Sequence, residues 1–270
     1  MESKQIKYWY MKNFRILIAA VFSILVLSAF KYKSKVTTIY LIGDSTVADY
    51  SLEENYQTKK FPQVGWGQVF QPFFAKDSLK LVKNILGNAK EVKIDDRAKG
   101  GRSTRTFFQE GRWAAVYNSL KKGDVVMMQF GHNDAAVDKT ERYVTIEGYK
   151  EFLRLFINQT KEKGATPIVL TPVARNYPWK DEKLANVHGE YPQAAIDVAK
   201  ELNVKFIDLN LLSMQFFTAK GQDYVTANYF MNFEAGKYPG YPEGQKDNTH
   251  FKVEGGVEVA RLVFNALKNL

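Results

Sequence analysis

Short runs of β-branched and aliphatic residues alternate along this chain with longer segments of helical periodicity. That alternation is typical of a parallel sheet covered by helices. The predicted strands span residues 37–42, 91–94, 124–130, 166–170 and 204–207. The predicted helices span residues 67–75, 105–120, 146–163, 190–202, 209–219 and 254–270. The first and third strands are apolar on both faces, so we expect them in the centre of the sheet. The chain is therefore predicted to adopt a three-layer α/β/α fold with a mostly parallel five-stranded sheet.

Composition limits the kinds of site that this fold can carry. The chain has 270 residues, of which 45% are hydrophobic, enough to bury one large core. Cysteine is absent, which excludes disulfides, a thiolate nucleophile and a cysteine-based zinc site. Only three histidines are present, so a multi-histidine metal cluster is not expected either.

The first 33 residues have the pattern of a targeting segment. Basic residues flank an unbroken apolar run at 16–30, as in an export signal. The run is shorter than the ~20 residues that a membrane span prefers. However, Ser28-Ala29-Phe30 followed by Lys31 is a poor cleavage site, so an uncleaved anchor is the alternative. We expect residues 1–33 to be an export signal or anchor and 34–270 a single domain, which is periplasmic, secreted or anchored through residues 16–30.

The positive charge of the chain is partly a property of this segment. The formal net charge is +9, but residues 1–33 hold six Lys/Arg and one Glu, which leaves +4 for the remainder. No Lys/Arg-rich run with interleaved aromatics follows, so nucleic acid is not an expected partner. A mildly cationic surface would attract an anionic polysaccharide at long range.

Polar clusters follow three of the predicted strands directly. In open α/β sheets ligands bind at the carboxyl ends of the strands, so such residues are the first candidates for a site. A fourth polar cluster precedes the last predicted helix. The four clusters are GDST at 43–46, DRAKGGRS at 96–103, GHND at 131–134 and DNTH at 247–250.

In this order, the clusters resemble the four blocks of SGNH (GDSL) hydrolases. Within that superfamily, GDSTVADY, GGRSTRTF, QFGHND, HGEYP and DNTHF are similar to the rhamnogalacturonan acetylesterases. The resemblance runs from about Thr37 to the C-terminus. It implies the flavodoxin-like SGNH hydrolase fold and a serine esterase activity without a metal or organic cofactor.

The chemistry of ester cleavage requires these residue types. A serine hydroxyl is a poor nucleophile until a base takes its proton, and histidine can take that proton and return it near neutral pH. We expect Ser45 to be the nucleophile and His250 its base. Asp247 can hold the imidazole if the segment turns, as the resemblance implies. The resemblance also assigns the oxyanion hole to the backbone N–H groups of Ser45 and Gly101 and to the side-chain amide of Asn133.

Structural roles are the alternative for each motif residue. Asp44 and Ser45 would also suit an N-cap, and Gly101 a turn with positive φ. Asn133 and Asp134 would suit a cap on the helix that follows the third strand, which is the role we expect for Asp134.

For the remaining histidines and several arginines, the sequence is compatible with two roles. His132 and His188 either line the substrate pocket or make structural contacts. Nearby arginines either bind uronate carboxylates, Arg102 being the main candidate, or pair with the local acids Asp95, Asp96 and Glu110. These arginines are Arg97, Arg102 and Arg105.

Three functions follow from these motifs. The first is a carbohydrate O-acetylesterase acting on rhamnogalacturonan (pectin), or on acetylated xylan or another decorated glycan, and working as a monomer. The second is a lipid-directed or broad-specificity esterase, for which an apolar cleft or lid is expected. The third is a carbohydrate-binding protein without activity, against which the intact set of Ser45, Asp247 and His250 argues.

Overall fold

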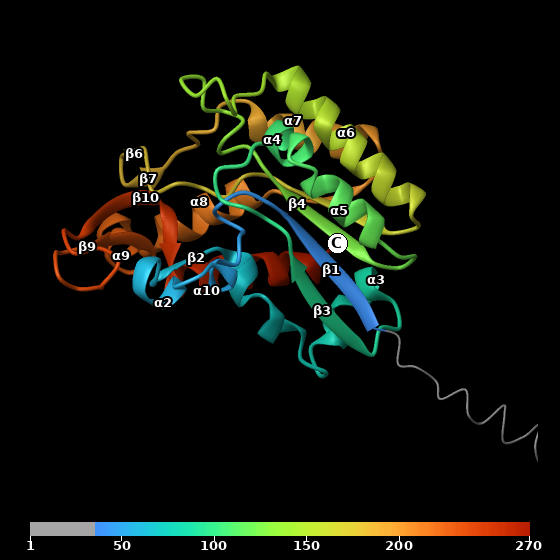
Figure 1. Cartoon of the computed structure of the whole chain (residues 1–270), viewed down its shortest axis with the longest axis horizontal. Helices are drawn as coiled ribbons and strands as arrows, with labels where there is room; N and C mark the ends of the chain where they lie inside the picture. The colour runs from blue at the N-terminus through green and yellow to red at the C-terminus, as the bar shows by residue number, and fades with distance from the viewer. Residues whose placement is uncertain (1–35) are drawn as a thin grey trace, which may run out of the picture. The chain divides into compact units, whose positions relative to one another are not determined.

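The computed structural model of the protein describes residues 36–270 (Figure 1). The predicted export signal or anchor at 1–33 lies outside the described residues. Between residues 36 and 270, every helix is too short or too polar to cross a membrane.

A five-stranded parallel sheet forms the centre of the fold. Its strands lie in the order β3-β1-β4-β5-β8, and each neighbouring pair is parallel. This arrangement confirms the predicted fold class and the interior positions of the first and third predicted strands. The strands are β1 (Val36–Gly43), β3 (Glu91–Asp96), β4 (Val125–Gln129), β5 (Thr166–Leu170) and β8 (Lys205–Ile207).

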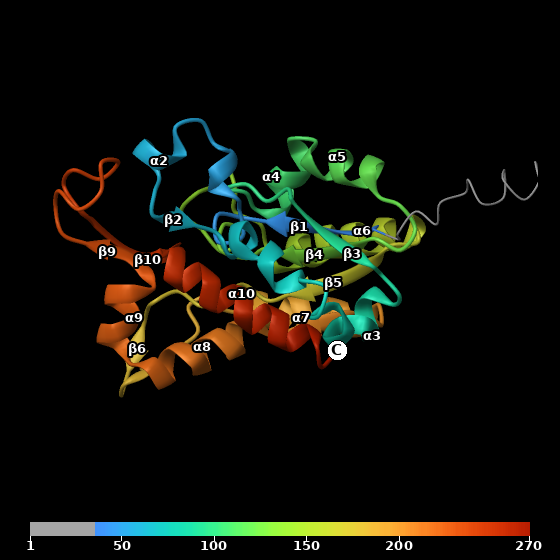
Figure 2. The same cartoon turned by 90° about the horizontal axis from the view of Figure 1, so that it is seen from below.

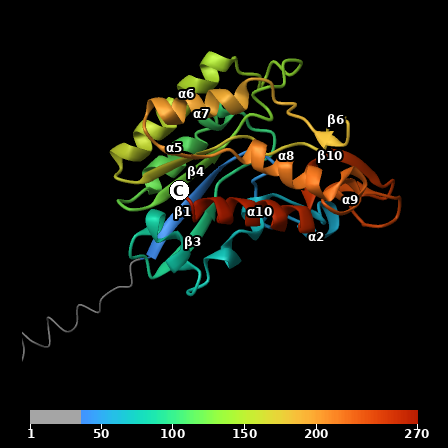
Figure 3. The same cartoon turned by 180° about the vertical axis from the view of Figure 1, so that it is seen from behind.

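Two hydrophobic clusters cover the two faces of the sheet, because successive side chains of a strand point to opposite faces. On β1, Tyr40 and Ile42 pack with helices α4, α5, α6 and α7. Ile39 and Leu41 pack on the other face with α8 and α10. Figures 1 and 2 show the helices around the sheet, and Figure 3 shows α8 and α10 from behind. These helices are α4 (Thr104–Gln109), α5 (Arg112–Ser119), α6 (Ile146–Glu162), α7 (Tyr191–Glu201), α8 (Leu209–Lys220) and α10 (Val253–Leu267).

Two predicted helices differ from the structure. The expected helix at 105–120 is split into α4 and α5 at Gly111, whose φ of +71° is left-handed. The expected helix at 67–75 is two 3₁₀ turns, Trp66–Val69 and Gln71–Phe74. Pro72 lacks an amide donor and prevents a continuous α-helix there. The other predicted helices lie within three residues of their observed bounds.

Residues 220–248, for which the sequence predicted neither a helix nor a strand, contain regular structure. This part of the chain contains α9 (Gln222–Asn228), β9 (Phe230–Phe233) and the start of β10 (Gln245–Lys252). β10 pairs antiparallel with β9 and with β2 (Gln63–Val64) in a small second sheet. Figure 1 shows this sheet beside the end of the molecule toward which β1 and β4 run.

The remaining elements are short. They are the helices α2 (Tyr56–Lys59) and α3 (Lys83–Leu86), the 3₁₀ turns Tyr50–Leu52 and Leu79–Val82, and the hairpin of β6 (Trp179–Lys180) and β7 (Lys183–Leu184).

Candidate active site

The turn that follows β1 positions Ser45. Oδ1 of Asp44 accepts hydrogen bonds from the backbone N of Thr46 at 2.9 Å and from its Oγ1 at 2.8 Å. These bonds close a tight turn at the carboxyl end of the strand, in the manner of an Asx turn. Ser45 is 9% exposed and lines a cavity of about 810 Å³. No helix begins at this turn, so Asp44 is not an N-cap, and its carboxylate instead holds the turn that presents Ser45.

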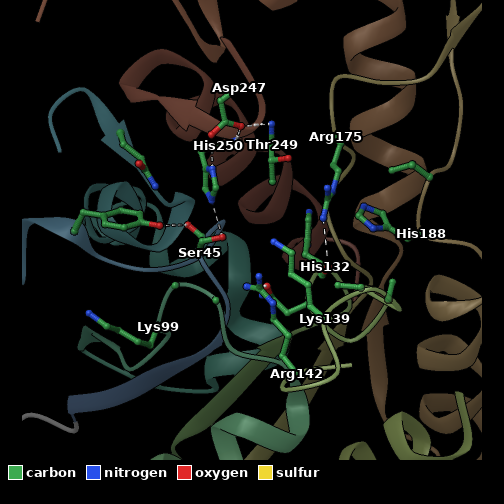
Figure 4. Close-up of a pocket in the computed structure, with 18 of the residues that line it drawn as sticks. Ser45, Lys99, His132, Lys139, Arg142, Arg175, His188, Asp247, Thr249 and His250 are labelled. Atoms are coloured by element: carbon green, nitrogen blue, oxygen red, sulfur yellow. Dashed lines mark hydrogen bonds and ion pairs between the residues drawn. The ribbon is translucent and has the colours of Figure 1, made fainter. Parts of the chain in front are cut away.

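His250 and Asp247 lie on β10 of the small sheet and are next to Ser45. Nε2 of His250 lies 2.9 Å from Oγ of Ser45, and Nδ1 of His250 lies 2.7 Å from Oδ2 of Asp247 (Figure 4). The ladder of β10 against β9 is irregular between Asp247 and Phe251, which gives the turn that the spacing of these residues requires. A carboxylate only accepts, so Nδ1 carries the proton and the lone pair of Nε2 faces Ser45.

The environment of Asp247 keeps its carboxylate ionised. Burial alone would raise the pKa of Asp247, but the His250 ring and the backbone N–H groups of Thr249 and His250 outweigh it, so the pKa is below its usual value. Those two N–H groups donate to Oδ1 at 2.7 and 3.1 Å. An ionised Asp247 can hold the imidazole and stabilise the imidazolium that forms when Ser45 loses its proton.

The residues expected to form the oxyanion hole line the same cavity as Ser45. Gly101 has a φ of +79°, as its alternative turn role requires, and the two roles are compatible. A Cβ on the preceding Gly100 would lie 3.6 Å from Cβ of Ser45, so this segment passes next to the nucleophile. Nδ2 of Asn133 donates to the carbonyl of Arg102 at 3.1 Å, which leaves its second hydrogen available.

Asp134 caps a different helix from the one expected. Its Oδ1 accepts from the backbone N and Oγ1 of Thr104 at 2.9 and 2.5 Å, at the start of α4. Its Oδ2 accepts from the backbone N of Gly131 at 3.1 Å. Burial raises the pKa of Asp134 to about 7. The side chain thus connects the segment that contains Asn133 to the one that contains Gly101.

His132 and His188 both line the cavity and are buried. Their ring centroids are 4.4 Å apart. Nε2 of His188 lies 3.0 Å from the carbonyl of Val173 and therefore carries the proton. Nδ1 of His132 lies 3.2 Å from Oδ2 of Asp44. Burial lowers the pKa of His132 in spite of the neighbouring carboxylate. His132 and His188 thus each line the pocket and also make structural contacts, so the two roles left open by the sequence are compatible.

The arginines considered for carboxylate binding are engaged elsewhere. Arg97 pairs with Asp95 at 2.5 Å, and Arg102 pairs with Glu110 at 2.9 Å. Arg105 donates to the backbone carbonyls of Thr140 and Tyr143. The residues that line the cavity include none of these three arginines. The structure thus favours pairing with a local acid for Arg97 and Arg102 but not for Arg105, and it does not bring Arg102 to the pocket.

Other cations, which the sequence did not single out, occupy the pocket. Lys139 and Arg142 come from the loop after β4, and Arg175 comes from the loop after β5. Figure 4 shows these three on one side of the pocket, with Ser45 on the other. Lys99 also lines the cavity but pairs with Glu53 at 2.6 Å. No pattern in the sequence indicated these residues, because they lie in loops beyond the ends of β4 and β5 rather than in the motifs at the strand ends.

Within residues 36–270, no group of three or more His, Asp or Glu side chains is arranged to hold a metal ion. The geometry described above instead joins a nucleophile, a base and a carboxylate in one chain of contacts. Such a chain is suited to acyl transfer through a covalent intermediate.

Comparisons with known proteins agree with this chemistry. The chain is 36% identical over 232 residues to the rhamnogalacturonan acetylesterase RhgT of Bacillus subtilis (strain 168), covering 86% of this chain and 90% of that protein. It is 37% identical over 235 residues to the probable rhamnogalacturonan acetylesterase YesY of the same organism, covering 86% and 93%.

Solved structures share the fold. The crystal structure of YxiM from Bacillus subtilis superposes with a TM-score of 0.68 at 28% identity, covering 87% of this chain and 57% of that one. The crystal structure of Axe2, an acetylxylan esterase from Geobacillus stearothermophilus, superposes with a TM-score of 0.55 at 17% identity, covering 86% and 94%. The model of the GDSL-like lipase/acylhydrolase family matches residues 41–255, and the chain belongs to that family.

Proposed function

We propose that this protein is a carbohydrate O-acetylesterase that removes acetyl groups from rhamnogalacturonan. The reaction type is inferred from one observation, which is the continuous contact from Asp247 through His250 to Ser45. The two relatives above 35% identity support the substrate, because one is named a rhamnogalacturonan acetylesterase and the other a probable one.

The geometry supports a two-step reaction. Oγ of Ser45 attacks the acetyl carbonyl carbon while Nε2 of His250 takes the hydroxyl proton. The oxyanion accepts hydrogen bonds from the N–H groups of Ser45 and Gly101 and from Nδ2 of Asn133. Each such donor typically lowers the barrier by ~3 kcal/mol.

Collapse of this intermediate breaks the bond between the acetyl carbon and the sugar oxygen. His250 gives its proton to that oxygen, and the deacetylated sugar leaves an acetyl-Ser45 enzyme. A water molecule, deprotonated by His250, attacks the acetyl carbon through the same oxyanion hole. The second collapse breaks the bond to Oγ, returns the proton to Ser45 and releases acetate.

The lining of the pocket favours a glycan over a lipid. Its aliphatic side chains are only Ala135, Ala136 and Val187, whereas the other lining residues are polar, charged, aromatic or glycine. The apolar cleft expected for a lipid esterase is not what surrounds Ser45. Polar groups convergent on a cavity are instead what fixes a hydroxyl-rich ligand.

The charge of the pocket favours an acidic glycan over a neutral one. No acid within ion-pair distance of Lys139 or Arg175 is found among residues 36–270, and both side chains line the cavity. Rhamnogalacturonan carries uronic acid carboxylates, which arginine and lysine recognise, whereas the xylan backbone is neutral. This difference is the reason for preferring rhamnogalacturonan over xylan.

The test is acetate release from acetylated rhamnogalacturonan, acetylated xylan and p-nitrophenyl acetate. Wild type is compared with Ser45→Ala and with the control Ser78→Ala, a serine that does not line the cavity. We expect fast release from rhamnogalacturonan that is lost only in Ser45→Ala. Cleavage of the small ester alone would refute the substrate, and an active Ser45→Ala protein would refute the nucleophile.

A second comparison tests the role of charge. The double variant Lys139→Gln/Arg175→Gln should lose at least about tenfold in kcat/KM on rhamnogalacturonan relative to its kcat/KM on xylan. The control Lys76→Gln, an exposed lysine outside the pocket, should keep the wild-type ratio. An unchanged ratio in the double variant would remove the argument for an acidic glycan.

A large polysaccharide such as rhamnogalacturonan is encountered outside the cell. We therefore also propose that residues 1–33 direct export. Expression of the full chain, followed by cell fractionation and N-terminal sequencing, would distinguish a cleaved signal from an anchor. Retention of the unprocessed protein in the cytoplasm would refute export.

A further inference from the structure

The side-chain amide of Asn133 lies between two partners of opposite hydrogen-bonding character. Oδ1 of Asn133 accepts from Nη1 of Arg142 at 3.1 Å. Nδ2 of Asn133 donates to the backbone carbonyl of Arg102 at 3.1 Å. Asn133 is 8% exposed, so water has little access to substitute for either partner.

These partners allow the amide only one orientation. A guanidinium has donors and no acceptor, and a backbone carbonyl has an acceptor and no donor. Rotating the amide by half a turn would place its NH₂ group against the guanidinium and its oxygen against the carbonyl oxygen. Both contacts would then be repulsive, and Oδ1 and Nδ2 of Asn133 would each lose a hydrogen-bond partner.

Arg142 is also close to the glycine of the oxyanion hole. A Cβ on Gly101 would lie 3.5 Å from Nη1 of Arg142. The same guanidinium nitrogen therefore adjoins the two residues expected to provide the second and third oxyanion donors. Arg142 also forms an ion pair, in which Nε lies 3.4 Å from Oε1 of Glu141, and this pair is weak because the Glu141 side chain is 69% exposed.

We propose that Arg142 is a positioning residue of the oxyanion hole, which fixes the Asn133 amide with its NH₂ group available to the developing negative charge. The inference rests on the proposed esterase function. Arg142 acts here through Asn133 and does not touch the reacting atoms. Preorganised donors are effective because they need no reorientation when charge develops.

Three variants test whether Arg142 acts because it can only donate hydrogen bonds, or because of its ion pair with Glu141. Arg142→Gln offers Asn133 either an oxygen or an NH₂ group and so does not specify its orientation. Arg142→Lys keeps a positive group that only donates. Glu141→Gln removes the ion-pair partner of Arg142 but leaves its hydrogen bond to Asn133.

Hydrolysis of p-nitrophenyl acetate measures the effect without a glycan-binding contribution. We expect kcat to fall at least about tenfold in Arg142→Gln, with KM within about twofold of wild type, since one oxyanion donor is typically worth 10²–10³ in kcat. Arg142→Lys should recover part of the loss, and Glu141→Gln should match wild type. Wild-type kcat in Arg142→Gln would overturn the proposal.

A double-mutant cycle with Asn133→Ala identifies the route of the effect. Once the amide is absent, Arg142→Gln should cause no further loss in kcat. An equal loss in the Asn133→Ala background would mean that Arg142 acts through its charge or through stability, and the proposal would fail.

A readout independent of turnover separates this proposal from the proposed function. In ¹⁵N-labelled protein, the two Nδ2 hydrogens of Asn133 are assigned by their disappearance in Asn133→Ala. Arg142→Gln should shift and broaden these signals, whereas Glu141→Gln should leave them unchanged. Unchanged Asn133 signals in Arg142→Gln would refute positioning, while a wild type inactive on every ester would refute only the proposed function.

Discussion

Oδ2 of Asp44 lies 3.2 Å from Nδ1 of His132, and both side chains are buried. Burial raises the pKa of Asp44, but the His132 ring and the hydrogen bonds from Thr46 outweigh it, and the pKa is below its usual value. Asp44 holds the turn of Ser45, and His132 directly precedes Asn133. The pair therefore connects the segment that contains Ser45 with the segment that contains Asn133.

Replacing His132 by Ala should destabilise the protein by about 2–3 kcal/mol, because a buried carboxylate loses the imidazole that faces it. Urea unfolding measures the loss. In the double variant with Asp44→Asn, the cost should be smaller than the sum of the two single costs. Additive costs would show that the two side chains do not interact.

Replacing Asp247 by Asn should lower kcat by about 10³- to 10⁴-fold while the fold is retained, because an amide does not hold the required tautomer of His250. Hydrolysis of p-nitrophenyl acetate and a far-ultraviolet circular dichroism spectrum measure the two properties. The exposed Asp77→Asn variant serves as the control. A loss of less than tenfold in Asp247→Asn would exclude Asp247 as the partner of His250.

Asp96 should make stability fall as pH rises. Its Oδ1 accepts from the backbone N of Ala98, but its buried Oδ2 has no partner among residues 36–270. Burial, together with the negative charges of Asp49 and Asp95, raises the pKa of Asp96 well above 3.8. The folded protein then holds the proton more tightly than the unfolded chain does, so the stabilisation is complete below pH 3.8 and is lost as pH rises through the raised pKa.

The variant Asp96→Asn is neutral at every pH and should lack this dependence. Its Tm relative to wild type should therefore increase from pH 4 to pH 8, as measured by thermal unfolding at several pH values. Asp77→Asn, again the exposed control, should show a constant difference. A constant difference for Asp96→Asn would mean that the Asp96 carboxyl is not protonated in the folded protein.

Replacing Gly65 by Ala should impair activity from outside the pocket. A Cβ at this position would lie 2.3 Å from the backbone carbonyl carbon of Val47, two residues after Ser45. The turn of Ser45 must then move, and overpacking of this kind costs about 1–3 kcal/mol.

Gly87→Ala provides the comparison, because Gly87 has a φ of +56° and open space around it. That variant should lose about 1–3 kcal/mol through backbone strain alone. Urea unfolding and kcat are measured for both proteins. We expect kcat to fall only in Gly65→Ala, and equal kcat values would show that the turn of Ser45 tolerates the displacement.

The sequence predicted the interior strands β1, β4 and β5 well because they are buried on both faces and read as largely apolar runs. It did not predict β10, whose only strongly apolar residue is Phe251 among Gln245–Lys252. Such a strand has no alternating pattern to recognise. Its place in the fold depends instead on packing, with the rings of Phe230 and Phe251 5.0 Å apart.

The candidate site was predictable to the extent that its residues stand in recognisable motifs at strand ends. Ser45, Asp247 and His250 meet as the resemblance implied. Arg142 and Arg175 were not predictable, because they lie in loops whose path is set by tertiary contacts and by no period in the sequence. The partner of Asp134 was missed for the same reason, since α4 approaches it from 30 residues away in sequence.

The contact between Ser45 and His250 joins residues that are 205 positions apart. Synthesis proceeds from the N-terminus, so the ribosome makes the serine 205 residues before the histidine. A nascent chain that ends before β10 has its nucleophile without a base, and it cannot hydrolyse esters whatever part of its sheet has folded. Esterase activity is therefore acquired only after β10 has been synthesised.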